Sequence, residues 1–252
     1  MSCEETRKKI SGAKHAALLL HGIVGTPDQF RLLIPLEETV PPDWTVYNLC
    51  YPGHGGKVQD FGRSRMEQWR DYARGAFLEL AESHERVLIV GHSMGTLFAI
   101  QLACEFPEKV SGLFLLNVPM RPWMRLFCMG NCLRIAFGRL RPDHPREACF
   151  GKACGVKPTP LIWRYIPWIL RVMELFAEII RTERILGQLR VPCVAFQSRK
   201  DDLVSNLSSR VLRKNKVIDV HQLPHSTHFY YTPEDQTQIF EAFFNMIKKI
   251  SC

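Results

Sequence analysis

Apolar residues fall into two kinds of stretch along this chain. Short continuous runs are typical of strands that are buried on both faces, as in a parallel sheet. Longer stretches with apolar residues every three or four positions predict amphipathic helices. The alternation of the two indicates an α/β fold, with a mostly parallel central sheet and helices on both faces. Strands are predicted at residues 16–20, 45–50, 87–90, 110–117, 191–197 and 217–223, and helices from near residue 28, at 66–82, after residue 95, at 203–212 and at 233–250.

One internal segment interrupts this alternation. Residues 119–189 are mostly helical in pattern and are broken repeatedly by glycine and proline. We interpret them as an inserted helical cap, or lid, and not as a separate domain. The sequence thus predicts an α/β core made of residues 1–118 and 190–252. A chain of 252 residues is long enough to bury a full core of this kind.

The strand predicted at 87–90 ends in Gly-His-Ser-Met-Gly, residues 91–95, and a helix-forming stretch follows. A strand, a sharp turn at Gly-x-Ser-x-Gly and a helix form a nucleophile elbow, which holds the serine in a strained conformation above the sheet edge. Gly91 and Gly95 supply the room that this turn needs. The pattern predicts Ser93 as a nucleophile. The structural alternative is a glycine-rich loop that only joins a strand to a helix.

A serine nucleophile needs a base within hydrogen-bonding distance, and the base needs a carboxylate to orient it. On a parallel sheet these groups come from loops at the carboxyl ends of strands. The loops after the last two predicted strands offer Asp201 with Asp202, and His225 with His228. We favour Asp201 as the acid, with Asp202 as the N-cap of the next helix. We favour His228 as the base because the two residues before it are small, and we expect His225 to shape the loop.

The loop after the first predicted strand, His21-Gly22-Ile23, supplies a third group. Attack on a carbonyl builds negative charge on its oxygen, and preorganised donors stabilise that charge. We predict that the backbone N–H groups of Ile23 and Met94 are these donors. Gly22 allows the close approach, and His21 holds the loop by hydrogen bonds. Together with the chain order Ser, Asp, His, this constellation predicts a serine hydrolase.

With these residues in place, the sequence resembles the α/β-hydrolase superfamily, and within it the bacterial carboxylesterase and monoacylglycerol lipase group. The resemblance implies the acid at Asp201 and the base at His228, and it covers nearly the whole chain except the cap. Members of the group often begin with two further antiparallel strands, which we expect to be missing or vestigial here. The resemblance rests on LLLHGIVG at residues 18–25, YPGHG at 51–55, VGHSMG at 90–95, VAFQSRKDD at 194–202 and STH at 226–228.

The predicted reaction is hydrolysis of carboxylic esters through an acyl-enzyme. The expected partner is a small-molecule acyl ester, and monoacylglycerol is one candidate. No metal or organic cofactor is required. A thioesterase or an acyltransferase would use the same triad, and a non-catalytic ligand-binding protein is the alternative from another class. A haloalkane dehalogenase is disfavoured because it needs a carboxylate where Ser93 stands. The sequence leaves acyl length and oligomeric state open.

Positive charge and tryptophan are concentrated in the cap. Residues 121–190 hold 13 Lys and Arg against 5 Asp and Glu, which accounts for the whole net charge of +8. We favour the interpretation that Trp123, Trp163 and Trp168 cover the cleft and bind substrate while the arginines, Arg171 among them, face water. The alternative is a basic amphipathic face that contacts an anionic lipid surface or an acidic substrate. No nucleic-acid-binding motif accompanies the charge, so a nucleic-acid partner is not expected.

The cysteines bear on the cellular setting. Cys50, Cys104 and Cys193 fall in predicted core elements, where reduced cysteine behaves as a small apolar residue. The four cysteines between residues 128 and 154 are spaced more widely than is common in zinc sites, so free thiols are favoured over a metal site. The N-terminal residues lack the apolar segment of a secretory signal, and no apolar stretch predicts a transmembrane helix. These features predict a reducing, cytoplasmic setting.

Overall fold

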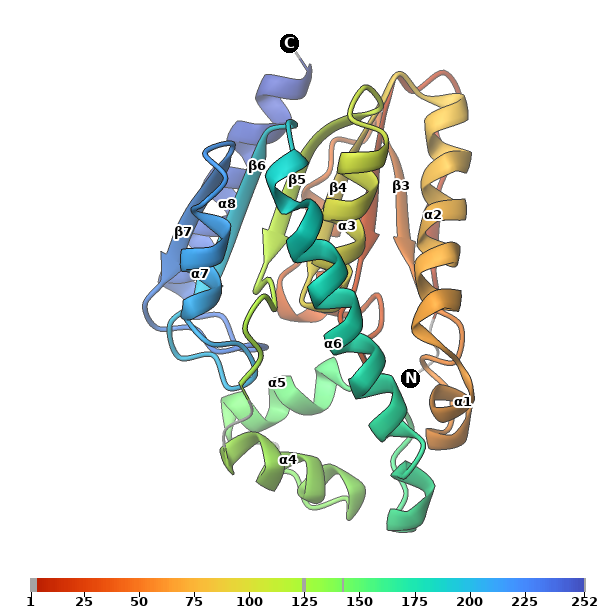
Figure 1. Cartoon of the computed structure of the whole chain (residues 1–252), viewed down its shortest axis with the longest axis vertical. Coiled ribbons are helices and arrows are strands. Elements are labelled where there is room, and N and C mark those ends of the chain that lie inside the picture. Colours follow the sequence, from red (N-terminus) through yellow and green to blue (C-terminus); the bar gives the residue numbers. More distant parts are fainter. Residues whose placement is uncertain (1–3, 124–125, 142, 252) are drawn as a thin grey trace.

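The computed structural model describes residues 4–123, 126–141 and 143–251. Within them lies a seven-stranded sheet with the order β1-β3-β2-β4-β5-β6-β7 (Figure 1). Neighbouring strands are parallel except for β1, which is antiparallel to β3. The predicted α/β fold with a mostly parallel sheet is therefore confirmed. The strands are β1 (Thr6–Lys8), β2 (His15–Leu20), β3 (Thr45–Leu49), β4 (Arg86–His92), β5 (Val110–Leu116), β6 (Cys193–Ser198) and β7 (Ile218–Leu223).

Helices cover both faces of the sheet and create two hydrophobic clusters (Figure 1). Successive residues of a strand point to opposite faces, so Leu18 of β2 packs in the first cluster and Leu19 in the second. Both side chains are fully buried, which explains why this strand is an unbroken apolar run. The helices are α2 (Met66–Ser83), α3 (Met94–Glu105) and α7 (Leu207–Leu212) on the first face and α8 (Pro233–Ser251) on the second.

The helix predicted from near residue 28 begins where expected, with Asp28 at its N-cap, but it is short and not α-helical. The structure has a single π-helical turn, Gln29–Leu33, followed by a 3₁₀ turn, Glu37–Thr39. Pro35 lies between them and lacks the N–H that a continuing helix would donate. A short helix that the apolar pattern does not predict, α1 (Val58–Arg63), follows β3.

In the residues that the structure describes, one short antiparallel strand, β1, precedes β2. It has three residues and pairs with β3, with Thr6 opposite Asn48 and Lys8 opposite Val46. It lies at the edge of the sheet. The expectation of missing or vestigial N-terminal strands is therefore confirmed for the described residues.

The segment between β5 and β6 holds the residues that we interpret as a cap. Figure 1 shows α4 and α5 beyond one end of the sheet, while α6 runs from that end along α3. Gln101 of α3 donates to Glu178 and Thr182 of α6, both at 2.8 Å. The later part of α6 thus packs as a core helix, and α6 joins the two parts of the molecule. The cap elements are α4 (Leu126–Ala136), α5 (Pro145–Ala153), η3 (Ile162–Tyr165), α6 (Trp168–Ile185) and η4 (Leu186–Gln188).

One cysteine differs from its expected state. Cys50, directly after β3, is disulfide-bonded, so the prediction of a reduced cysteine there is wrong. Cys104 and Cys193 are free thiols, and burial raises the pKa of each. Cys50 therefore does not support the expectation of a reducing compartment. In the described part of the chain, no helix has both the length and the apolar character needed to cross a bilayer.

Candidate active site

Ser93 occupies a strained turn between β4 and α3. Its backbone angles are φ 51° and ψ −121°, and strain of this kind is typical of functional sites. A Cβ on Gly95 would lie 2.0 Å from the Leu20 carbonyl oxygen, and one on Gly91 would lie 2.9 Å from a backbone atom of α3. The two glycines supply the room that was predicted of them. The Ser93 N–H donates to Leu116 O at 2.9 Å, which fixes the turn to β5.

His228 and Asp201 form a buried hydrogen-bonded pair. His228 Nδ1 lies 2.8 Å from Asp201 Oδ2, and the two side chains are 2% and 1% exposed. The other carboxylate oxygen accepts the N–H groups of Leu203 and Val204 at 2.7 and 2.8 Å. These bonds leave the carboxylate one orientation, with Oδ2 toward the imidazole. Asp201 follows β6 and His228 follows β7, at the carboxyl edge of the sheet where such loops meet.

The neighbouring residues Asp202 and His225 are not part of the His228–Asp201 pair. The helix α7 has Asn206 at its N-cap, so the N-cap role predicted for Asp202 is wrong. The His225 N–H donates to Asp235 Oδ2 at 3.0 Å, in keeping with its predicted role in shaping the loop. The same carboxylate oxygen accepts the Ser226 hydroxyl at 2.6 Å. The first turn of α8 therefore holds the loop that carries His228.

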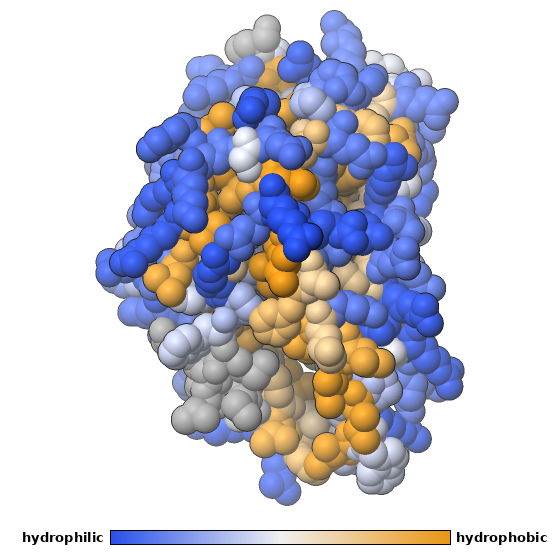
Figure 2. All heavy atoms as spheres, in the orientation of Figure 1, coloured by the Kyte–Doolittle hydropathy of each residue, from blue (hydrophilic) through white to orange (hydrophobic). Residues whose placement is uncertain are grey.

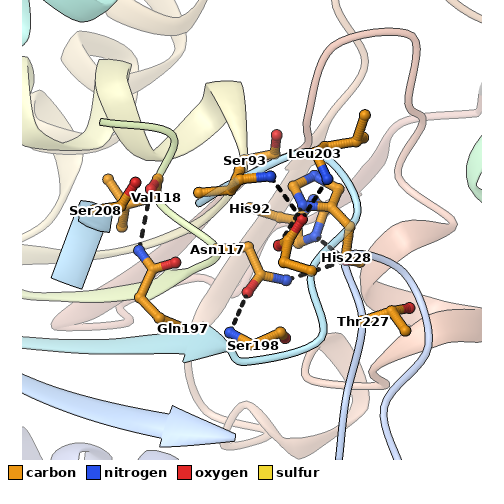
Figure 3. Close-up of polar contacts among 12 residues, drawn as sticks. His92, Ser93, Asn117, Val118, Gln197, Ser198, Leu203, Ser208, Thr227 and His228 are labelled. Carbon is orange, nitrogen blue, oxygen red and sulfur yellow. Dashed lines mark hydrogen bonds and ion pairs between the residues drawn. The ribbon is translucent and has the colours of Figure 1, made fainter. Parts of the chain in front are cut away.

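Two further side chains, which sequence reasoning missed, hold the His228 backbone. The His228 carbonyl oxygen accepts from His92 Nε2 and Asn117 Nδ2, each at 3.1 Å (Figure 3). Asn117 Oδ1 accepts the Ser198 N–H at 2.9 Å, so one amide connects β5, β6 and the His228 loop. Burial, with the nearby His228, lowers the pKa of His92 to about 3, and His92 stays a neutral donor. The available signal was an asparagine at a strand end, a residue type that tolerates the φ of 54° found here.

Ser93 and His228 belong to adjoining parts of the site. His92, next to Ser93, packs edge-on against the His228 ring with centroids 5.0 Å apart. Ser93 and Phe229 line the same cavity. Among the described residues, no hydrogen bond joins the Ser93 hydroxyl to the His228 imidazole. In enzymes without substrate this bond is often long or poorly aligned, so the proton transfer between the two stays a prediction.

The loop after β2 brings a second stretch of backbone against Ser93. A Cβ on Gly22 would lie 2.9 Å from Ser93 Cβ, so glycine permits the approach. His21 Nδ1 donates to Gly22 O at 2.8 Å, and His21 Nε2 accepts a backbone N–H of the loop after β3 at 3.3 Å, which confirms that His21 holds this loop. Ile23 follows Gly22, and Met94, as the first residue of α3, has an N–H without an acceptor inside its helix. The oxyanion role of these two N–H groups stays a prediction.

The end of the cap helix α5 is attached to this loop. The Gly155 N–H donates to Val24 O at 2.8 Å. A Cβ on Gly155 would lie 2.8 Å from the Gly25 carbonyl oxygen, so the two backbones are in close contact. Val24 itself has a φ of 60°, which is strained for a β-branched residue. The cap and the loop that carries Ile23 are therefore joined directly.

A cavity of about 530 Å³ lies between the elbow and the cap, and Ser93 is part of its wall. Most of the wall is apolar. Trp123 and Trp168 line it, whereas Trp163 does not, because η3 leaves that indole 63% exposed on the outside. Arg171 of α6 also lines the cavity and is only 5% exposed. For Arg171, the prediction that the cap arginines face water is therefore wrong.

The cap cysteines do not form a metal site in the part of the chain that the structure describes. No group of three or more His, Cys, Asp or Glu side chains there is arranged to hold a metal ion. Cys149 and Cys154 are free thiols. Burial raises the pKa of Cys149 and of Cys154, so these groups stay protonated and are weak nucleophiles.

Comparison with known proteins gives the family and the fold of this chain. A thermostable monoacylglycerol lipase of Bacillus sp. (strain H-257) is 30% identical over 94 residues, which is 36% of this chain and 36% of that protein. A structure from the metagenome-derived lipolytic enzymes LipS and LipT has a TM-score of 0.73 at 20% identity and covers 98% of both chains. The monoacylglycerol lipase of Paleococcus ferrophilus has a TM-score of 0.68 at 15% identity, over 97% of this chain and 98% of that one. The alpha/beta hydrolase family model matches residues 17–242, and this chain therefore belongs to the alpha/beta hydrolase family.

Proposed function

We propose that this protein hydrolyses carboxylic esters through Ser93, His228 and Asp201. The observation that carries the proposal is the buried 2.8 Å hydrogen bond between His228 Nδ1 and Asp201 Oδ2. With Nδ1 engaged as the donor, Nε2 is the basic atom of the imidazole, as a serine hydrolase requires. The strained backbone of Ser93 and the membership of the hydrolase family support the same assignment.

In the proposed reaction, His228 Nε2 takes the Ser93 proton while Ser93 Oγ attacks the ester carbonyl carbon. Asp201 holds the imidazole tautomer and stabilises its charged form. The N–H groups of Ile23 and Met94 donate to the oxyanion. The alcohol leaves with the proton from His228, and water then cleaves the acyl-enzyme by the same route and releases the acid. These steps use side chains, backbone and water alone.

The proposed substrate is a small-molecule acyl ester. An apolar cavity of about 530 Å³ beside Ser93 suits an acyl chain, and Trp123 and Trp168 would contact it. Monoacylglycerol is one such ester, supported by the likeness to two monoacylglycerol lipases. Trp163 is not part of this binding proposal. A thioesterase or an acyltransferase would use the same residues.

A fluorophosphonate probe tests the proposed function. Such probes form a covalent bond with an activated serine, so we expect the folded protein to be labelled at Ser93, as located by mass spectrometry of the peptides. We also expect turnover of an oxygen ester. Faster turnover of the matched thioester would change the proposed activity from esterase to thioesterase. A folded protein that is neither labelled nor active on either ester would contradict the proposal and favour a non-catalytic ligand-binding role.

We also propose that the cap places the cavity against an anionic lipid surface. Apolar side chains that are more than half exposed gather on η3 and the first half of α6, and Figure 2 shows the apolar surface over this part of the molecule. A patch of this kind marks an interaction site. Arg164 is exposed in the same segment, and the cap holds the whole excess of positive charge, which favours anionic lipid. The side chains are Ile162, Trp163, Ile166, Ile169, Leu170 and Met173.

Cosedimentation with vesicles tests the lipid contact. We expect the wild type to bind vesicles of phosphatidylcholine with phosphatidylglycerol more strongly than vesicles of phosphatidylcholine alone. Replacing Trp163 and Met173 together by serine removes two large exposed apolar groups and should weaken binding about tenfold. Leu32→Ser is the matched control, because Leu32 is 53% exposed outside the cap. Equal binding of both variants and the wild type would exclude this surface.

A further inference from the structure

Arg171 places a permanent positive charge in the wall of an otherwise apolar cavity. Its side chain is 6% exposed, and it is the one charged residue among those that line the cavity in the described chain. A guanidinium does not lose its proton in proteins. Burying it costs free energy unless its N–H groups find acceptors.

The bonds of Arg171 leave donor capacity unused. Arg171 Nη2 donates to Glu174 Oε1 at 2.7 Å. Arg171 Nε is buried and has no partner in the part of the chain that the structure describes. Glu174 is itself shared, because its Oε2 accepts the Met66 N–H at the start of α2 at 3.0 Å. Glu174 therefore does not satisfy the whole planar donor set of the guanidinium, which has five N–H groups.

We propose that Arg171 binds an anionic group, a carboxylate or a phosphate, carried by the ester substrate away from the bond that is cleaved. Carboxylate and phosphate oxygens match the planar donor fork of arginine, and charge-assisted hydrogen bonds are the strong ones. The excess of positive charge in the cap would draw such a substrate toward the cavity. This inference rests on the proposed ester hydrolysis and narrows its substrate class to esters that bear a negative charge.

Three matched esters test the inference by kcat/KM. They are 1-octanoylglycerol, which is neutral, 1-octanoylglycerol 3-phosphate, with the charge on the alcohol, and the glycerol monoester of octanedioic acid, with the charge at the far end of the acyl chain. We expect the wild type to prefer one of the charged esters over the neutral one by about 10- to 100-fold. Which of the two is preferred shows whether Arg171 faces the alcohol or the far end of the acyl chain of the bound ester.

Two variants separate recognition from a structural role. In Arg171→Gln, the ratio of charged to neutral kcat/KM should fall to about one. In Glu174→Gln, the carboxamide oxygen still accepts the Met66 N–H while the competing negative charge is gone, so the ratio should stay or rise. If both variants lower the rates of all three esters equally, Arg171 serves only to place Glu174, and the inference is wrong. A wild type without preference for either charged ester overturns it too.

Binding without turnover separates this inference from the proposed function. Calorimetric titration of Ser93→Ala with the same three esters measures affinity when no ester is cleaved. A preference for a charged ester that is lost in Ser93→Ala with Arg171→Gln supports the role of Arg171 even if the wild type proves to be inactive. Turnover of esters without any charge preference in rate or affinity leaves the proposed function standing and removes this inference.

Discussion

Alanine at position 93 is expected to lower kcat for ester hydrolysis by about 10⁵- to 10⁶-fold and to abolish labelling by a fluorophosphonate. The reason is that the nucleophile of a serine triad acts as a unit with its base, so its removal costs nearly the whole covalent route. The fold should survive, because serine and alanine both carry a Cβ and the φ of 51° therefore costs the variant no more than the wild type. We expect the unfolding free energy to stay within about 0.5 kcal/mol of the wild type. Urea unfolding and steady-state turnover check the two expectations.

Ser198→Ala is the matched control for this substitution. Ser198 is 1% exposed at the end of β6, and its hydroxyl is buried without a partner in the described residues. Its N–H bond to Asn117 comes from the backbone and persists in alanine. Turnover of Ser198→Ala should therefore stay close to that of the wild type. A Ser93→Ala protein that still hydrolyses esters at more than a hundredth of the wild-type rate would place the nucleophile elsewhere.

Asparagine at position 201 is expected to lower kcat by about 10⁴-fold, if the effect known for serine proteases transfers. Two backbone N–H groups, of Leu203 and Val204, donate to Asp201 Oδ1. The carboxamide must offer its oxygen to them and therefore turns its NH₂ toward His228 Nδ1. That arrangement makes Nδ1 an acceptor and puts the imidazole proton on Nε2. An Nε2 that already carries a proton cannot accept one from Ser93.

Asp202→Asn provides the comparison for this effect, because it makes the same chemical change one residue away. Its kcat should remain within a few-fold of the wild type. The pair of variants decides the identity of the acid: a severe loss in Asp202→Asn with little loss in Asp201→Asn reverses the assignment. Circular dichroism and thermal unfolding should show both variants folded, since each preserves the size and polarity of the side chain.

The sequence was sufficient to predict those strands whose apolar run has one explanation, burial on both faces of the sheet. β2 and β4 lie inside the sheet with neighbours on both sides and helices on both faces, so their runs are unbroken and their ends are sharp. Ser93 and Asp201 follow the inner strands β4 and β6, whereas His228 follows the edge strand β7, most of whose residues are only half-buried or exposed. The structure brings Asp201 and His228 into contact. The short helix Gln29–Leu33 shows the limit, because Pro35 ends a helix whose apolar spacing continues to Leu36.

Side-chain directions in the cap could not be read from spacing alone. Trp163 and Trp168 are close in sequence, yet Trp168 Nε1 donates to Val58 O at 3.0 Å and its ring packs on Phe61, while Trp163 faces outward. The partner of Trp168 is α1, a helix that the apolar pattern does not predict. The Arg171 side chain points inward for a similar reason. It donates to Glu174, and Glu174 accepts the N–H of Met66 at the start of α2. Such choices depend on contacts between segments far apart in the chain.

The bond between Gly155 and Val24 links the end of the cap helix α5 to the loop that carries a proposed oxyanion donor. Val24 is the next residue after Ile23, whose N–H is one of the proposed oxyanion donors. Any motion that lifts the end of α5 must break the 2.8 Å bond from Gly155 to Val24 O or carry this loop away from Ser93. A motion that keeps this bond would draw the loop, and with it the Ile23 N–H that we propose as an oxyanion donor, away from Ser93, so we expect esters to be cleaved only with the end of α5 in the position described here.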